Sequence, residues 1–180
     1  MARKHTKKTR QRICNAYHEA GHAVVGHALG RLIKEVSIEP SAAARAETPQ
    51  VSGYCEFDSE AEETHGITQW GPRSDHPHSI AVMLAGAVAY VRLCHERGWG
   101  ITEQLSGTGH DVQAAEFASM RMSRTELGRK RLFNREERRA IEVVTEQWEV
   151  VEAVAEALLT HGTLGRDDVP RIIQELAGSV

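Results

Sequence analysis

Three residues near the start of the chain have the types and the spacing of a hydrolytic metal site. His18, Glu19 and His22 form the pattern H-E-x-x-H inside the apolar-rich run from Asn15 to Leu29. Residues four apart on a helix lie about 40° apart in projection, so both imidazoles can reach one ion. Glu19 directly follows the first histidine, where its carboxylate can take a proton from a water held by that ion. The pattern therefore predicts a zinc site for peptide hydrolysis, with Glu19 as the catalytic residue.

A third metal ligand must come from elsewhere, because a catalytic zinc ion usually takes three protein ligands and leaves the fourth position to water. The longer pattern H-E-x-x-H-x-x-G-x-x-H is excluded, since Val25 and Ala28 occupy the positions of its glycine and its last histidine. His27 lies five residues beyond His22, about 140° around the helix, and is expected to face away from the metal. The remaining option is a carboxylate from a later helix.

The elements that must position these residues follow from hydrophobic periodicity. We expect a mainly α (α+β) fold in which a small antiparallel β-element accompanies the helices. A basic flexible arm is expected over residues 1–12, followed by a single domain over residues 13–180. Helices are expected over residues 12–29, 78–95, 110–127, 134–160 and 167–176, strands over 33–39 and 51–57, and loops over 41–50 and 58–77.

Composition limits the partners and the compartment. The 180 residues carry a net charge of −3, which gives no general affinity for nucleic acid. The longest apolar stretch, Ile80–Val91, is far shorter than the roughly 20 residues that span a bilayer, and no apolar signal segment follows the basic start. Cys14, Cys55 and Cys94 are widely spaced and form no CxxC pair, which is typical of reduced thiols. We therefore expect a cytoplasmic protein without nucleic-acid or membrane partners.

The segment Ala16–Ala23 resembles the peptidase domain of the FtsH-type ATP-dependent zinc metalloproteases. Further segments resemble that family in the family's own order, from about residue 13 to about residue 176. They are Glu35–Pro40, Gly53-Tyr54, Ile80–Ala89, Ser106–Val112, and Thr163-Leu164 followed by Asp167–Val169. This resemblance implies a zincin-like helical domain that binds Zn²⁺ and cleaves polypeptides.

The resemblance also implies the third ligand. Ser106–Val112 is similar to the family's segment T-G-x-x-[NH]-D-[IL], whose aspartate binds the metal, and this implies that Asp111 is the ligand. Asp111 is expected in the first turn of a helix, where the backbone dipole favours a carboxylate. The residues alone leave two alternatives, namely that Asp111 only starts the helix, or that His110 in the same turn takes the metal.

The sequence also departs from the family. No phosphate-binding loop G-x-x-x-x-G-K-[ST] occurs, and the ATPase module and membrane anchor of the family have no counterpart in these residues. Ala87, Tyr90 and Val91 lie near positions where the family has an arginine and acidic residues, so the groups that support the histidines must differ. The expected loop before the helix at 78–95 carries Trp70, His76 and His78 and is unlike that of the family.

The function expected from these features is that of a zinc-dependent endopeptidase, a hydrolase that acts on peptides or unfolded proteins without an ATPase of its own. A separate ATPase partner is left open. A substrate peptide is expected to add to the strand at Val36–Pro40 or at Val51–Phe57. The alternative is a non-catalytic, zinc-containing binding or regulatory module, which would have no need of Glu19. The hypothesis of a nucleic-acid partner is supported only by the basic arm over residues 1–12 and is weak.

Overall fold

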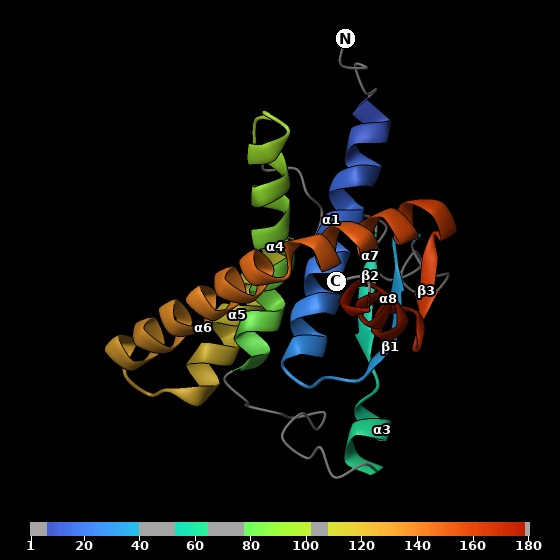
Figure 1. Cartoon of the computed structure of the whole chain (residues 1–180). Helices are drawn as coiled ribbons and strands as arrows, with labels where there is room; N and C mark the ends of the chain where they lie inside the picture. Colours follow the sequence, from blue (N-terminus) through green and yellow to red (C-terminus); the bar gives the residue numbers. More distant parts are fainter. Residues whose placement is uncertain (1–6, 40–52, 65–77, 102–107, 179–180) are drawn as a thin grey trace.

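The computed structural model describes residues 7–39, 53–64, 78–101 and 108–178. The fold is mainly helical with a small antiparallel sheet, as the sequence predicts (Figure 1). The helices are α1 (Lys7–Ala28), α3 (Ser59–Thr64), α4 (His78–Glu96), α5 (Thr108–Met122), α6 (Glu126–Glu146), α7 (Trp148–His161) and α8 (Asp168–Ala177). The strands are β1 (Ile33–Ser37), β2 (Tyr54–Phe57) and β3 (Thr163–Gly165).

Helix α1 is the central element of the fold. Its residues from Cys14 to Gly26 are all buried, and it packs against α4, α7 and the sheet. Small side chains allow the close approach of α4: a Cβ atom on Gly21 would lie 2.6 Å from the Ala85 carbonyl oxygen and 2.8 Å from the Ala89 Cβ. The resulting contact between α1 and α4 fixes the helix that carries His18 and His22.

Helix α1 begins at Lys7, five residues before the expected start at residue 12. The part of the basic arm at residues 7–12 is therefore helical. Arg10 anchors this first part of the helix, because its Nη2 donates to the Gly100 carbonyl oxygen at 2.7 Å and its guanidinium lies 4.7 Å from the Trp99 ring centre. The sequence pattern could not reveal these contacts, since they join residues about 90 positions apart.

The sheet has the strand order β2-β1-β3, and both pairings are antiparallel. Val36 of β1 lies opposite Cys55 of β2 and Leu164 of β3. Val36 and Ile38 are buried, and so is Ser37 between them. The third strand was not predicted, because three residues are too few for a recognisable alternation. The expected loop at 41–50 and the first two residues of the expected strand at 51–57 lie outside the described residues.

The expected helix at 134–160 is instead two helices, α6 and α7, which run end to end across α4 and α1 (Figure 1). They meet at Gln147, whose φ of −109° and ψ of 30° are not helical. The bend places Trp148 in the core: its ring packs against Tyr17, and its Nε1 donates to Glu96 Oε2 at 3.0 Å. Helix α6 starts early because the Thr125 side chain accepts a hydrogen bond from the Gly128 amide, which caps the helix.

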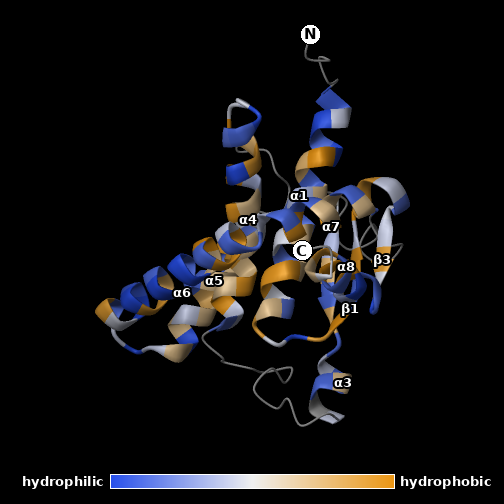
Figure 2. Cartoon of the chain, viewed as in Figure 1, coloured by the Kyte–Doolittle hydropathy of each residue, from blue (hydrophilic) through white to orange (hydrophobic). Residues whose placement is uncertain are grey.

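Helix α4 is, among the described helices, the one that is both long enough and apolar enough to cross a membrane. In this fold its apolar residues pack against α1, α5 and α6, and Figure 2 shows hydrophobic segments where these helices meet. The expected bounds 78–95 agree with α4 to within one residue. The expected loop at 58–77 begins with the short helix α3, and the rest of it, with Trp70 and His76, lies outside the described residues.

Candidate metal centre

Two imidazoles and one carboxylate meet at a point between α1 and α5. His18 Nε2 lies 3.1 Å from His22 Nε2, and Asp111 Oδ2 lies 3.0 Å from the former and 3.3 Å from the latter. Among the described residues, these three form a group whose potential ligand atoms could all hold one metal ion. The predicted set His18, His22 and Asp111 is therefore brought together, across 89 positions of sequence between the second histidine and the aspartate.

The positions of the three side chains follow from their helices. His18 and His22 are one turn apart on α1, and their rings meet edge to face with centres 4.7 Å apart. Asp111 lies in the first turn of α5, which packs on α4. Helix α4 packs against both α1 and α5, and Asp111 at the start of α5 reaches the two histidines in the interior of α1.

A backbone carbonyl orients His22. Its Nδ1 donates to the Val82 carbonyl oxygen on α4 at 2.7 Å. With Nδ1 engaged by this carbonyl, Nε2 is the ring nitrogen that faces Asp111 and His18, and it is the nitrogen that would bind a metal. No side-chain motif encodes this contact, so sequence reasoning could not find it.

Gly86 on α4 provides the space for both rings. A Cβ atom at this position would lie 2.5 Å from His22 Nε2 and 2.7 Å from His18 Cε1. Any larger residue would push the imidazoles away from Asp111. The sequence shows a run of small residues around position 86. Such a run indicates close helix packing, but it does not indicate that the packed groups are the two imidazoles.

Glu19 is buried beside His18, His22 and Asp111. Its side chain faces the start of the β2 segment, since a Cβ atom on Gly53 would lie 2.7 Å from Glu19 Oε1. Burial raises the pKa of Glu19 to about 7, with a lowering contribution from His22 and a raising one from Asp111. A carboxylate with a pKa near neutrality is suited to accept and return a proton, although a nearby dication would lower this pKa.

The charges of the ligand set stabilise one another. Burial raises the pKa of Asp111, but the facing imidazoles of His18 and His22 outweigh burial and hold that pKa well below its usual range. Burial lowers the pKa of His22, but the carboxylates of Asp111 and Glu19 raise it to about 9. Burial lowers the pKa of His18. The carboxylate of Asp111 is therefore ionised at neutral pH and can bind a cation.

The three atoms fit the requirements of a zinc ion. Zinc binds nitrogen and oxygen at about 2.0–2.1 Å, and a tetrahedral arrangement then separates its ligand atoms by about 3.3 Å. The observed separations are 3.0–3.3 Å. Asp111 Oδ2 and His18 Nδ1 are buried and have no hydrogen-bond partner of good geometry among the described residues. The carboxylate oxygen of Asp111 and the Nε2 atoms of both histidines therefore converge on one point, as the ligand atoms of a shared cation would.

The other histidines considered from the sequence do not join this group. His27 lies at the end of α1 and is half-buried, and burial lowers its pKa. His110 is exposed on α5, so Asp111 and not His110 turns toward the two imidazoles. His78 starts α4 and its Nδ1 lies 2.9 Å from Glu136 Oε2.

The sequence was compared with protein-family models and with curated proteins, and neither comparison gives a match.

Proposed function

We propose that this protein is a zinc-dependent endopeptidase with a zincin-like helical fold, in which His18, His22 and Asp111 hold Zn²⁺ and Glu19 is the catalytic base. The observation that carries the proposal is the triangle of ligand atoms with sides of 3.0–3.3 Å, next to a buried glutamate. Three ligands are typical of a catalytic zinc site, whereas a structural site is usually closed by four. The resemblance of the sequence to FtsH-type peptidases supports the same assignment.

Within this proposal, the bound ion would supply Lewis-acid polarisation of the substrate carbonyl and of a water. Glu19 accepts the proton of the attacking water and then delivers it to the nitrogen of the leaving amine. His22 is held in orientation by the Val82 carbonyl oxygen, so its Nε2 stays directed at the centre. Asp111 supplies the negative charge that compensates the cation.

The sheet narrows the choice between the two strands expected to bind substrate. Strand β1 is paired on both sides, by β2 and β3, so it offers no free edge over Ile33–Ser37. Strand β2 is an outer strand among the described strands, and Gly53 at its start faces the Glu19 carboxylate. We therefore place an extended substrate beside Tyr54–Phe57.

The substrates we propose are peptides, flexible segments and unfolded proteins, cleaved with or without a separate ATPase partner. Cys14, Cys55 and Cys94 are all free thiols, which suits the cytoplasm as the compartment.

The decisive experiment compares Glu19→Gln with the unchanged protein. An amide cannot accept a proton at neutral pH, so we expect cleavage of fluorescent casein to fall by at least about a thousandfold while zinc content stays at one per chain. Atomic absorption gives the metal content, and a chelator should abolish the activity of the unchanged protein.

The matched controls lie on the same helix. His22→Gln should lose zinc and activity together, whereas His27→Gln should keep both, because His27 is outside the ligand group. Undiminished cleavage by Glu19→Gln would exclude the proposed mechanism. Zinc binding without any cleavage by the unchanged protein would favour the non-catalytic alternative.

A further inference from the structure

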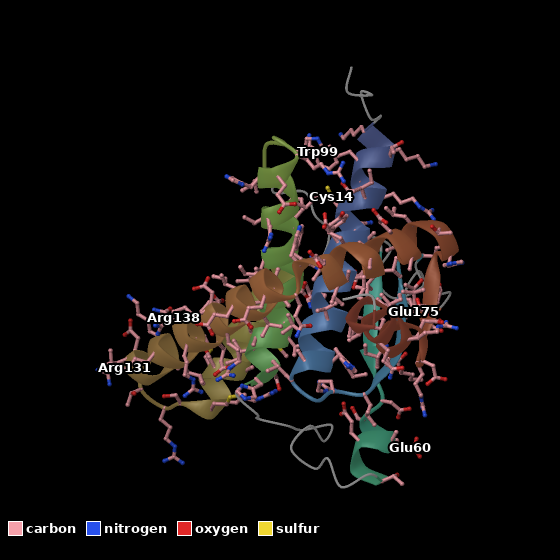
Figure 3. All side chains as sticks on the ribbon, viewed as in Figure 1. Cys14, Glu60, Trp99, Arg131, Arg138 and Glu175 are labelled. Carbon is pink, nitrogen blue, oxygen red and sulfur yellow. The ribbon has the colours of Figure 1, made fainter. Side chains whose placement is uncertain are left out.

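One region of the surface differs in charge from the rest of the molecule. Residues 121–139, at the end of α5 and along α6, contain eight basic and three acidic residues, a net charge of +5 in a chain whose net charge is −3. Seven of the eight basic residues are arginine. Figure 3 shows Arg131 and Arg138 on α6 pointing away from the body of the molecule.

Large apolar side chains are exposed in the same region. Phe117 and Met120 on α5 are 67% and 52% exposed, and Leu127 at the start of α6 is 59% exposed. The two helices join through the short connection 123–125, and the Thr125 side chain caps the start of α6 by accepting a hydrogen bond from the Gly128 amide. We name this region the hairpin surface and define it by Phe117, Met120, Arg124, Leu127, Lys130 and Arg131.

The basic side chains of the hairpin surface are not neutralised by their neighbours. Arg124, Lys130 and Arg131 are exposed and form no ion pair with any described residue. By contrast, Arg135 and Arg139 farther along α6 face the buried Glu136. Free cations in the same helical hairpin as exposed aromatic and methionine side chains are the composition of surfaces that bind polypeptides, in which arginine pairs with carboxylates through two parallel hydrogen bonds.

The hairpin surface is joined to the metal centre by α5 itself. Asp111 is in the first turn of this helix, and Phe117 and Met120 follow it at distances of roughly 9 and 14 Å along the axis. An extended polypeptide advances about 3.3–3.6 Å per residue, so about three to four residues cover this distance. A single unfolded substrate is therefore long enough to reach from the centre to Phe117 and Met120 of this region.

We infer that the hairpin surface is an exosite for an acidic segment, interspersed with apolar residues, of the same polypeptide whose peptide bond is cut at the metal centre. This inference rests on the proposed function and specifies its substrate class. Carboxylates of the substrate pair with Arg124, Lys130 and Arg131, while its apolar side chains cover Phe117, Met120 and Leu127. Occupation of the exosite raises the affinity for substrate and leaves the chemical step unchanged.

The test measures binding separately from cleavage. The full chain carrying Glu19→Gln is titrated into a fluorescein-labelled peptide of four aspartates and two leucines, and into the same peptide with asparagines in place of the aspartates. We expect the acidic peptide to bind at least about tenfold more tightly, and higher salt to remove that difference.

The double variant Lys130→Glu with Arg131→Glu should remove this difference in affinity as well. The matched control, Lys7→Glu with Lys8→Glu, makes the same change in net charge at exposed positions of α1 and should alter the affinity less than twofold.

Cleavage kinetics then test whether the hairpin surface contributes to the affinity for a substrate that is cut at the metal centre. With a substrate whose acidic segment lies about four residues from the scissile bond, Lys130→Glu with Arg131→Glu should raise KM and leave kcat unchanged. Equal binding of the acidic and neutral peptides, or an unchanged affinity in this variant, would overturn the inference. So would tighter binding of a single-stranded oligonucleotide, or of vesicles containing anionic phospholipid, than of the acidic peptide. If the unchanged protein cleaves nothing, the proposed endopeptidase fails, and the peptide titration still reports whether the surface binds acidic segments.

Discussion

At the scale of single residues, the centre depends on a glycine, Gly86, as well as on the side chains that face one another. The hydrogen atom of Gly86 occupies the place where a methyl group would contact His22 Nε2 and His18 Cε1. Both imidazoles can therefore turn toward Asp111 without steric conflict. The same helix supplies the Val82 carbonyl oxygen that orients His22. Helix α4 contributes no metal ligand of its own, yet it determines the direction of the two histidines.

Gly86→Ala should consequently weaken metal binding. We expect the zinc affinity to fall by about tenfold to a hundredfold, the usual effect of disturbing groups that support metal ligands. Competition with a fluorescent zinc chelator measures this change. Gly109→Ala is the control, because a Cβ atom there meets nothing within 4 Å and helical alanine is favoured over glycine. Equal affinities in the two variants would show that Gly86 has no part in positioning the histidines.

The meeting of His18, His22 and Asp111 was largely predictable from the sequence, whereas the α4 groups that contact the histidines were not. The spacing of His18 and His22 on a helix is a local property, so the pattern alone identifies them. Asp111 required the resemblance, because a helix-start aspartate has no distinctive local signal. The Val82 carbonyl and the space at Gly86 depend on the packing of α4 against α1, which arises only in the folded molecule.

At the scale of elements, α6 is attached to the beginning of α4 by a buried carboxylate. Glu136 is 0% exposed, and its oxygens lie 2.9 Å from His78 Nδ1, 2.8 Å from Arg135 Nε and 3.4 Å from Arg139 Nε. Burial raises the pKa of Glu136, but the facing groups of His78 and Arg135 outweigh burial and bring it below its ordinary value of 4.5. The ionised form is therefore favoured in the folded protein.

This attachment should make stability depend on pH in a predictable direction. Because the folded-state pKa of Glu136 is below 4.5, its contribution is complete above that pH and is lost as the pH falls further. We expect Glu136→Gln to lower the free energy of unfolding at pH 7 by about 1.5–3 kcal/mol, and the difference to shrink below pH 4.5. Urea unfolding at several pH values measures it, with the exposed neighbour variant Glu137→Gln as the control. A difference that stays constant down to pH 3 would contradict this assignment.

The elements themselves were predicted best where apolar residues form a run or alternate with polar ones. Helix α4 and strand β1 follow directly from runs of apolar residues and from alternation. The division of residues 126–161 into α6 and α7 was missed because Trp148 turns into the core against Tyr17, a tertiary contact that overrides a continuous helical pattern. Strand β3 gains its structure from pairing with β1, which is also a property of the folded chain.

At the scale of the whole molecule, the proposed ion would be a cross-link between distant parts of the chain. Two ligands come from α1, the central helix, and the third comes from α5, which is otherwise held mainly by α4 and α6. The unfolded chain separates His22 from Asp111 by 89 positions and has no preformed site. Metal binding therefore favours the folded state alone, and its free energy adds to that of folding.

Stability should therefore follow the concentration of free zinc. Above the dissociation constant, each tenfold increase in free zinc should raise the free energy of unfolding by about 1.4 kcal/mol, because only the folded chain binds the ion. Denaturant unfolding in a series of zinc buffers measures this slope. Asp111→Asn keeps the shape of the side chain but removes its charge, so its stability should respond to zinc only at much higher concentrations. His27→Gln should retain the full slope, since its imidazole is outside the group. If Asp111→Asn shows the same slope and midpoint as the unchanged protein, then α5 does not supply a ligand, and the connection between α1 and α5 through the metal has to be abandoned.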